Sequence, residues 1–215
     1  VVTTIPVYNS EEFLLQTLES LACQTLRPDR VIVIDDGSTD RTRSIVESFN
    51  GLKCEWTPNP GRLGLFGNFN RCLDFASEAD YLHILHADDL ITPDFYAVMT
   101  GVLADCSGFG MAWCLDERID ENNRRLSISG KADGAVEILE RDDFLRRKAE
   151  IGNQAFAATL LKTSRKPVPC RFPTDMPILG DMVYWARFGA SCDRLVHVHR
   201  LLAKYRWHGS NATCS

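Results

Sequence analysis

The sequence predicts an α/β fold built on a doubly wound, mostly parallel sheet. Short apolar runs alternate with helical patterns through the first hundred residues. The run Val31–Ile34 is apolar without interruption, which is typical of a strand buried on both faces. Turn residues and acidic pairs follow two of these runs directly. Four strand–helix units in about 105 residues indicate a Rossmann-like sheet with helices on both faces.

The N-terminal half has the clearer pattern of elements. Four apolar runs are expected to be strands, over residues 1–7, 31–34, 52–56 and 81–85. We expect Asn9 to cap the first helix, with Glu12 three positions on, and Thr92-Pro93 to open the last helix. The helices between the strands carry apolar residues at helical spacing: Leu14, Leu18 and Leu21; Ile45, Val46 and Phe49; Phe66, Phe69, Leu73 and Ala76; Phe95, Val98, Met99 and Val102.

The C-terminal half has a looser pattern, interrupted by prolines. We expect it to share one sheet with the first half, so that residues 1–105 and 106–215 are two halves of a single domain, the second of them irregular. Its expected elements are a strand over 109–115, a polar hairpin over 117–130, a charged helix over 140–149, a strand over 153–162, a helix over 181–188 and strands over 195–206.

Composition excludes several classes of protein. A net charge of -5 over 215 residues argues against broad binding to nucleic acid or anionic membranes. No run of about 18 apolar residues is present, so we expect no membrane span and at most peripheral contact with a membrane. The eight cysteines form no C-x-x-C pair, which favours free thiols in a reducing cytoplasm. Because Val1 already lies in an expected strand, we also expect that residues are missing before it. The chain stops shortly after residues 207–211, so we expect a missing tail there as well.

Two acidic pairs follow expected strands, Asp35-Asp36 after the second and Asp88-Asp89 after the fourth. In an open parallel sheet, ligands bind at the carboxyl ends of the strands. Like charges placed together repel unless a cation or a set of donors offsets them. A hard divalent ion such as Mn²⁺ or Mg²⁺, held by carboxylates and substrate phosphates, is the natural partner. Each pair alone could equally be a turn or a helix cap.

Several short segments along the chain form a recognisable series. They are IPVYNSEEFL at 5–14, SLACQT at 20–25, VIVIDDGSTD at 31–40, NPGR at 59–62 with Asn68 and Asn70, YLHIL at 81–85 with Asp88-Asp89, LGD at 179–181, and YRWH at 205–208 with Ser210 and Asn211. Together they resemble glycosyltransferase family 2, whose members have the GT-A fold. The resemblance covers nearly the whole chain and is most specific in its first segments.

The resemblance implies a nucleotide-sugar donor site in residues 1–105 and an acceptor site in residues 106–215. Pro6 and Tyr8 would line the nucleotide pocket, and Asp36 would accept from the N3–H of uracil. Arg62 would approach the donor, and Asp88 would lie beside the ribose or the donor sugar.

The metal and the catalytic base are also implied by the resemblance. Asp89 would bind Mn²⁺ or Mg²⁺ on the diphosphate, and His208 would reach the metal or the diphosphate from the terminal loop. Asp181 would be the general base. The expected activity is inverting transfer of a sugar from a UDP-sugar to a hydroxyl of a carbohydrate or lipid-linked acceptor. Such an enzyme of cell-surface polysaccharide or glycolipid synthesis would be cytoplasmic or peripheral at the inner face of the membrane.

Three departures from the family pattern stand out. His86 replaces an aspartate that many relatives carry two positions before Asp88, and Gly180 replaces the glutamate usual before the base. The Q-x-x-R-W element of processive polysaccharide synthases is absent, which favours a single addition. Two other functions stay open: a non-catalytic binding domain on a decayed transferase fold, and a sugar nucleotidyltransferase. The second normally carries a glycine-rich loop where this chain has Pro6-Val7-Tyr8-Asn9.

The remaining histidines and one basic run have two interpretations each. His83 is expected to be packed in the core. His197 and His199 alternate on a strand and therefore share a face, but no third zinc ligand is evident in the sequence. The run Arg146-Arg147-Lys148 is expected to be the solvated end of a helix, and contact with a membrane surface is the alternative.

Overall fold

The computed structural model describes residues 1–151, 156–176 and 179–209. The first half contains the elements β1 (Val2–Val7), α1 (Leu14–Ala22), β2 (Arg30–Asp35), α2 (Thr42–Ser48), β3 (Cys54–Pro58), α3 (Leu65–Leu73), η1 (Asp74–Glu78), β4 (Tyr81–Ile84), β5 (Leu90–Ile91) and α4 (Phe95–Val102). The second contains β6 (Gly110–Ile119), β7 (Arg125–Ile128), β8 (Val136–Leu139), α5 (Arg141–Ile151), η2 (Phe156–Ala158), β9 (Thr159–Lys162), α6 (Gly180–Ala190) and β10 (Arg194–Arg206). The η elements are 3₁₀ helices.

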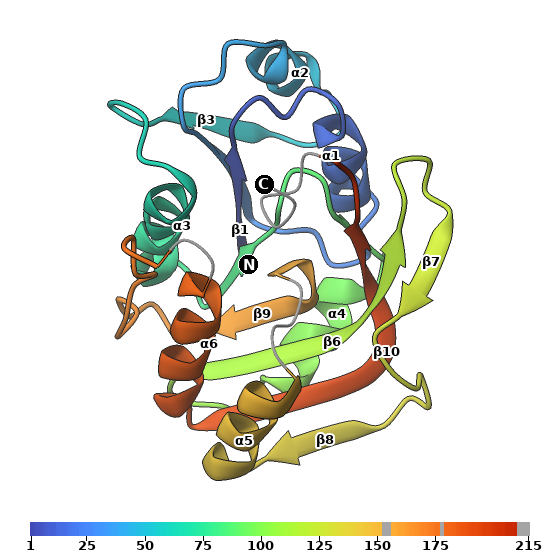
Figure 1. The fold of residues 1–215 in the computed structure, drawn as a ribbon, viewed down its shortest axis with the longest axis vertical. Coiled ribbons are helices and arrows are strands. Elements are labelled where there is room, and N and C mark those ends of the chain that lie inside the picture. The colour runs from blue at the N-terminus through green and yellow to red at the C-terminus, as the bar shows by residue number, and fades with distance from the viewer. Residues whose placement is uncertain (152–155, 177–178, 210–215) are drawn as a thin grey trace.

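One curled sheet runs through both halves of the chain (Figure 1). Its main strand order is β3-β2-β1-β4-β9-β6-β10-β5, with β7 paired to β6 and β8 paired to β10. Strands β1 to β4 are mutually parallel where they pair, and β6 is parallel to β10. Strand β9 is antiparallel to both β4 and β6, so β6 runs in the same direction as β4. The α/β fold class with a mostly parallel sheet is confirmed.

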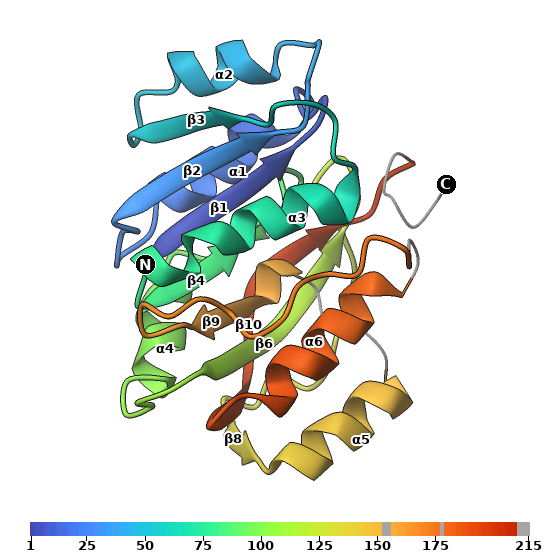
Figure 2. The same cartoon turned by 90° about the vertical axis from the view of Figure 1, so that its left-hand side faces the viewer.

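Helices cover both faces of this sheet (Figure 2). On one face, apolar residues of α1, α2 and α4 pack against the sheet, and on the other those of α3, α5 and α6 do so. His83 of β4 lies in the first layer as predicted, fully buried, with its Nδ1 2.9 Å from the hydroxyl of Tyr96. That hydroxyl is 2.5 Å from Oγ1 of Thr3, so a polar chain ties α4 to two neighbouring strands.

Both predicted helix starts in the first half were wrong. Asn9 does not cap α1: its backbone has a φ of 49° and its Oδ1 accepts from the N–H of Thr39 at 2.9 Å. The side chain is therefore used to join the loops after β1 and β2, and α1 begins only at Leu14. Helix α4 begins at Phe95, two residues after Pro93, because Thr92 instead pairs its N–H with the carbonyl of Leu202 beside β5.

The second half differs more from expectation. The hairpin of β6 and β7 and the helices α5 and α6 are present, but strands β5 and β8 were not predicted. The expected strands over 195–206 are one strand with register shifts opposite β6. Of the strand expected over 153–162, residues 153–155 lie outside the described residues, and the strand itself begins at Thr159.

Two expectations about the whole chain can be compared with the structure. The seven cysteines within the described residues are free thiols, while Cys214 lies outside them. Among the helices that the structure describes, none has both the length and the apolar character to span a bilayer.

The end of β10 is joined to the turn after β4 by Arg206, whose side chain is fully buried. Its backbone N–H donates to Oδ1 of Asp89 at 2.9 Å, and its Nε donates to the carbonyl of Asp88 at 2.8 Å. Nη2 reaches Oε1 of Gln16 at 2.9 Å, and the guanidinium lies 4.6 Å from the ring centroid of Phe13. One side chain thus holds α1, the acidic turn and the last strand together.

Arg206→Ala is expected to lower the free energy of unfolding by about 3–5 kcal/mol, the range for breaking a buried charged network. Urea-induced unfolding followed by circular dichroism measures this change. Arg200→Ala is the matched control, since Arg200 lies on the same strand but is exposed and pairs with Asp94 at the surface. Its loss should stay within about 1 kcal/mol. Equal losses in the two variants would contradict the role of Arg206.

Candidate active site

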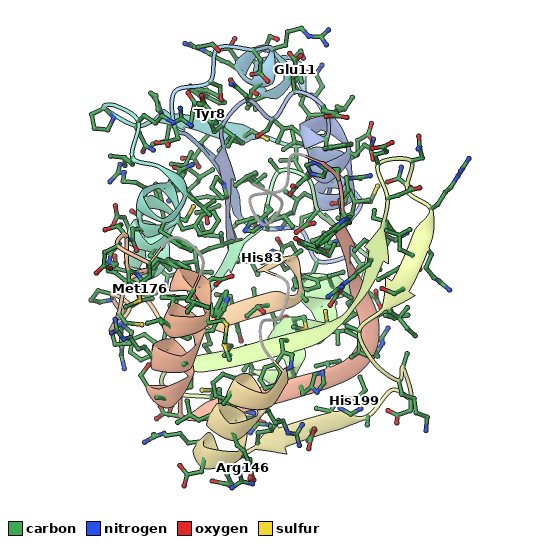
Figure 3. All side chains as sticks on the ribbon, viewed as in Figure 1. Tyr8, Glu11, His83, Arg146, Met176 and His199 are labelled. Atoms are coloured by element: carbon green, nitrogen blue, oxygen red, sulfur yellow. The ribbon has the colours of Figure 1, made fainter. Side chains whose placement is uncertain are left out.

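The candidate site lies where β2, β1 and β4 end side by side. These strands are parallel neighbours, so their carboxyl ends share one edge of the sheet. Asp36 follows β2, and Asp88 and Asp89 follow β4. Tyr8 follows β1, and Figure 3 shows its side chain at this end of the molecule. Residues far apart in the sequence are therefore gathered at the edge where α/β sheets bind ligands.

Asp36 is buried and organises the loop over residues 59–64. Its Oδ1 accepts from Nδ2 of Asn59 at 3.0 Å and from the N–H of Leu63 at 2.7 Å. Its Oδ2 accepts from the N–H of Gly64 at 2.8 Å. A carboxylate offers about four acceptor positions, so these three bonds leave roughly one for a further donor. The uracil contact predicted for Asp36 stays a prediction, and the structure adds a positioning role.

The organised loop places Arg62 over Tyr8. The guanidinium carbon of Arg62 lies 3.9 Å from the ring centroid of Tyr8, within cation–π distance, and the tyrosine is 42% exposed. Pro6, in β1 beside Ile34 of β2, is partly buried just before this surface. The structure thus brings three of the predicted nucleotide-pocket residues to one place, with an aromatic ring and a cation facing solvent.

Asn68 of α3 is the buried support beneath this pocket. Its Nδ2 donates to the carbonyls of Val7 and Ile34 at 3.4 and 3.2 Å, and its Oδ1 accepts from Asn59 at 3.0 Å. The ends of β1 and β2 are therefore tied to the helix and, through Asn59, to Asp36. The sequence had marked both asparagines as part of the family motif, without giving them this role.

The two carboxylates of the second acidic pair have different surroundings. Asp89 is fully buried, and Arg206 donates to its Oδ1. Its Oδ2 is buried without a hydrogen-bond partner among the described residues and lies 3.9 Å from Nδ1 of His86. Burial, followed by the charge of Asp88, raises the pKa of Asp89 well above its usual range. Asp89 is therefore part of the core beneath the site.

Asp88 is the more accessible member, with 27% of its side chain exposed. Its Oδ2 lies 3.0 Å from Nε2 of His208, whose ring packs 4.8 Å from that of Phe13. Burial acts to raise the pKa of Asp88, but the hydrogen bond with His208 and the nearby His86 outweigh it and the pKa is lowered. Asp88 is thus held ionised beside an imidazole.

These residues fit a divalent cation. Ligand atoms of His86, Asp88 and Asp89 all lie within 4.8 Å of one another. The metal role predicted for Asp89 and the ribose or sugar role predicted for Asp88 stay predictions. Of the two carboxylates, Asp88 is the more exposed and is the one paired with His208.

Asp181 lies in the first turn of α6, on the same side of the site. Its Oδ1 accepts from the N–H of Met182 at 2.7 Å. Its negative charge acts on His86, whose pKa is lowered by burial while Asp88 and Asp181 oppose that shift. His86 also stacks on Phe69 of α3, with ring centroids 5.1 Å apart. The base predicted from the sequence is therefore electrostatically linked to the acidic pair through His86.

Gly180 allows the start of α6 to pack closely against α3. A Cβ atom at this position would lie 2.5 Å from the ring of Phe66 on α3, so only glycine fits without a shift. The glutamate usual in the family before the base has no room here. The sequence showed this departure but gave no sign of its cause, because Phe66 is over a hundred residues away.

Two site residues were missed by sequence reasoning. In the sequence, Arg206 was identified only as the second residue of the segment YRWH at 205–208. No residue next to it in the sequence predicted that its guanidinium would be buried. His86 had been noted as a replaced aspartate, whereas the structure places its Nδ1 3.9 Å from Oδ2 of Asp89 and its ring against Phe69. Ser210 and Asn211, the last residues of the terminal element, lie outside the described residues.

Comparison with known proteins agrees with this geometry. Residues 3–158 match the model of a family described as glycosyl transferase family 2. Glycosyltransferase GlyG of Streptococcus pneumoniae is 23% identical over 172 residues, which cover 75% of this chain and 55% of that protein. The amylovoran biosynthesis glycosyltransferase AmsB of Erwinia amylovora is 36% identical over 89 residues, covering 40% of this chain and 29% of AmsB.

The fold is also shared with a solved structure. Residues 1–349 of S. aureus TarS, in complex with UDP-GlcNAc, superpose with a TM-score of 0.81 at 19% identity, covering 100% of this chain and 60% of that one. The chain thus spans about half of GlyG and about three fifths of that TarS chain. The family match extends over most of the chain and includes the loops that carry Asp36, Asp88 and Asp89. This chain belongs to glycosyl transferase family 2.

Proposed function

We propose that this chain transfers a sugar from a UDP-sugar to an acceptor hydroxyl, with inversion at the anomeric carbon and with the help of Mn²⁺ or Mg²⁺. The observation that carries the proposal is the grouping of His86, Asp88 and Asp89 at the carboxyl edge of the sheet, with Nε2 of His208 3.0 Å from Asp88. This arrangement offers carboxylates that can bind a cation, and Asp181 in the first turn of α6 is the proposed base. The cation would stabilise the leaving diphosphate, and the base would take the acceptor proton.

The nucleotide would bind over β1 and β2. Tyr8 and Arg62 present a ring and a cation to solvent, which suits a base and a phosphate. Asp36 and the buried amides of Asn59 and Asn68 give the pocket a fixed shape. The structure of TarS with UDP-GlcNAc, which has the same fold, supports uracil as the base of the donor.

Asp88 and His208 would hold the metal, with His86 and Asp89 behind them. A divalent cation bound there would offset the charge that develops on the leaving diphosphate. His208 is kept in place by Phe13 and Asp88, and Asp88 is kept ionised by His208. These contacts orient the ligands before any substrate binds, and Arg206 maintains the turn that carries them.

Asp181 would remove the proton of the acceptor. In the transfer, the acceptor oxygen bonds to the anomeric carbon, the bond from that carbon to the diphosphate breaks, and the acceptor proton moves to Asp181. An aspartate is a weak base, but the hydroxyl becomes acidic as its new bond forms, and positioning supplies much of the rate. The packing of Gly180 on Phe66 fixes where α6 presents this carboxylate.

The acceptor would be a carbohydrate or a lipid-linked sugar in the making of a cell-surface polysaccharide or glycolipid. Support comes from AmsB, a relative named for amylovoran biosynthesis. The acceptor would approach from the side of α6, because Asp181 is on that helix.

Asp88→Asn is expected to weaken Mn²⁺-dependent binding of UDP by about tenfold or more, which is a loss of roughly 1.4 kcal/mol. The reason is that the amide cannot neutralise the cation and loses the charge-assisted contact with His208. Calorimetric titration of UDP with Mn²⁺ and then with EDTA measures it. Asp94→Asn, at an exposed carboxylate, should bind UDP like the wild type. If the wild type bound UDP with the same affinity in Mn²⁺ and in EDTA, the proposed metal dependence would be wrong. If it bound no UDP in either, the proposed UDP-sugar donor would be wrong.

Asp181→Asn is expected to lower kcat by about 10²–10⁴, the usual contribution of a general base, while UDP binding is kept. Initial rates of transfer from UDP-sugars measure kcat, and the anomeric configuration of the product reports inversion. Asp80→Asn is the control, because Asp80 is exposed beside the other end of β4 and pairs with Arg165. If Asp181→Asn transferred sugar at the wild-type rate, the assignment of the base would be wrong. If the wild type bound UDP but transferred no sugar, a non-catalytic binding domain would be favoured.

A further inference from the structure

A second group of possible metal ligands lies far from the donor site, on strands β8 and β10. The two strands pair antiparallel, and Glu137 is directly opposite His197 in the register. His199 is two residues further along β10, on the same face as His197. Figure 3 shows His199 beside β8, at the other end of the molecule from Tyr8. Backbone bonds fix its place, since its N–H donates to Ala135 and its carbonyl accepts from Gly134.

The distances within this group suit a shared ion. Oε2 of Glu137 lies 3.6 Å from Nε2 of His199 and 4.0 Å from Nδ1 of His197. Two ligand atoms each about 2.1 Å from a tetrahedral zinc ion lie about 3.4 Å apart, close to the distance from Glu137 to His199 and shorter than that to His197. One ligand atom from each of the three residues lies within 4.8 Å of the others. Binding would therefore draw His197 closer to Glu137.

The imidazole of His199 is oriented for such a role. Its Nδ1 lies 3.3 Å from Oδ1 of Asp133, and its Nε2 is buried without a hydrogen-bond partner among the described residues. A carboxylate on one ring nitrogen favours the tautomer whose other nitrogen is free to bind a metal. His197 is stacked on Trp113, with ring centroids 5.1 Å apart.

Glu137 has a competing partner in Arg147 of α5. The guanidinium donates to both carboxylate oxygens, at 2.7 Å to Oε2 and 2.5 Å to Oε1. Because a carboxylate has about four acceptor positions, two bonds from Arg147 leave room for an ion on the histidine side. Arg147 then orients the ligand instead of blocking it.

We propose that Glu137, His197 and His199 form a second metal site, which takes Zn²⁺ or a similar transition-metal ion and is independent of the donor site. Two imidazoles and one carboxylate are a ligand set typical of zinc. The acidic donor site, in contrast, suits harder ions. A bound ion would fasten β8, whose outward side chains Val136 and Ile138 are exposed, to the long strand β10.

Zinc titration of the intact chain without nucleotide tests this proposal, by calorimetry and by the visible absorption of Co²⁺ as a substitute ion. One tight site is expected, with a rise in Tm when zinc is added, because an ion that binds only the folded state stabilises it. His199→Ala and Glu137→Gln should each lose the tight site and the rise in Tm. Asp133→Asn, which keeps the three ligands but removes the carboxylate beside Nδ1 of His199, should weaken zinc binding by about 10–100-fold.

Asp88→Asn and His208→Ala serve as matched controls at the donor site. Both should keep the tight zinc site, and circular dichroism in the absence of metal checks that every variant is folded. The proposal would be overturned by a wild type that binds no zinc tightly. It would equally be overturned if His199→Ala, still folded, bound zinc like the wild type, or if the tight site disappeared only in the donor-site variants.

Discussion

The structure around the acidic pair depends on one buried arginine. Arg206 supplies a backbone donor to Asp89 and a side-chain donor to the carbonyl of Asp88, and its guanidinium reaches α1 as well. An unpaired buried cation would be strongly destabilising, so these contacts must form together. The consequence is that the turn after β4 has its shape only when the last strand of the sheet is in place. Residues of the first half are therefore positioned by the second.

The same constraint gives two adjacent carboxylates different properties. Asp89 lies at the buried end of the network, where removal from water disfavours its charge, and its pKa is raised. Asp88 lies at the solvent end, where His208 stabilises the charge and the pKa is lowered. Neighbours in sequence are thus divided into a core residue and a partly exposed, ionised carboxylate. The division follows from which partners surround each one, and both partners, Arg206 and His208, come from the end of the chain.

The parts of this protein that could be predicted from sequence are those governed by local pattern. The buried strands β1, β2 and β4 and the apolar faces of α1, α3 and α4 follow from spacing alone, and the motifs identified the loops that carry Asp36 and Asp88. The rest depends on contacts across the chain. Strand β8 is only four residues long, and its apolar Val136 and Ile138 are exposed, so it does not have the pattern of a buried strand and Glu137 could not be recognised as the partner of His197. Asn9 has the residue type of a helix cap but is used to join two loops.

Position 180 shows how such distant contacts explain a departure from a family pattern. A glutamate before Asp181, the proposed base, would add a second negative charge at the start of α6. In this chain the backbone of α6 lies directly on the ring of Phe66, and that approach requires glycine. Phe66 in turn stacks against Phe172, with centroids 5.8 Å apart, and Phe172 stacks on Tyr184 of α6 itself at 3.8 Å. The aromatic layer thus replaces a charged neighbour as the means of placing Asp181, so a rigid hydrophobic contact sets the position of a polar group.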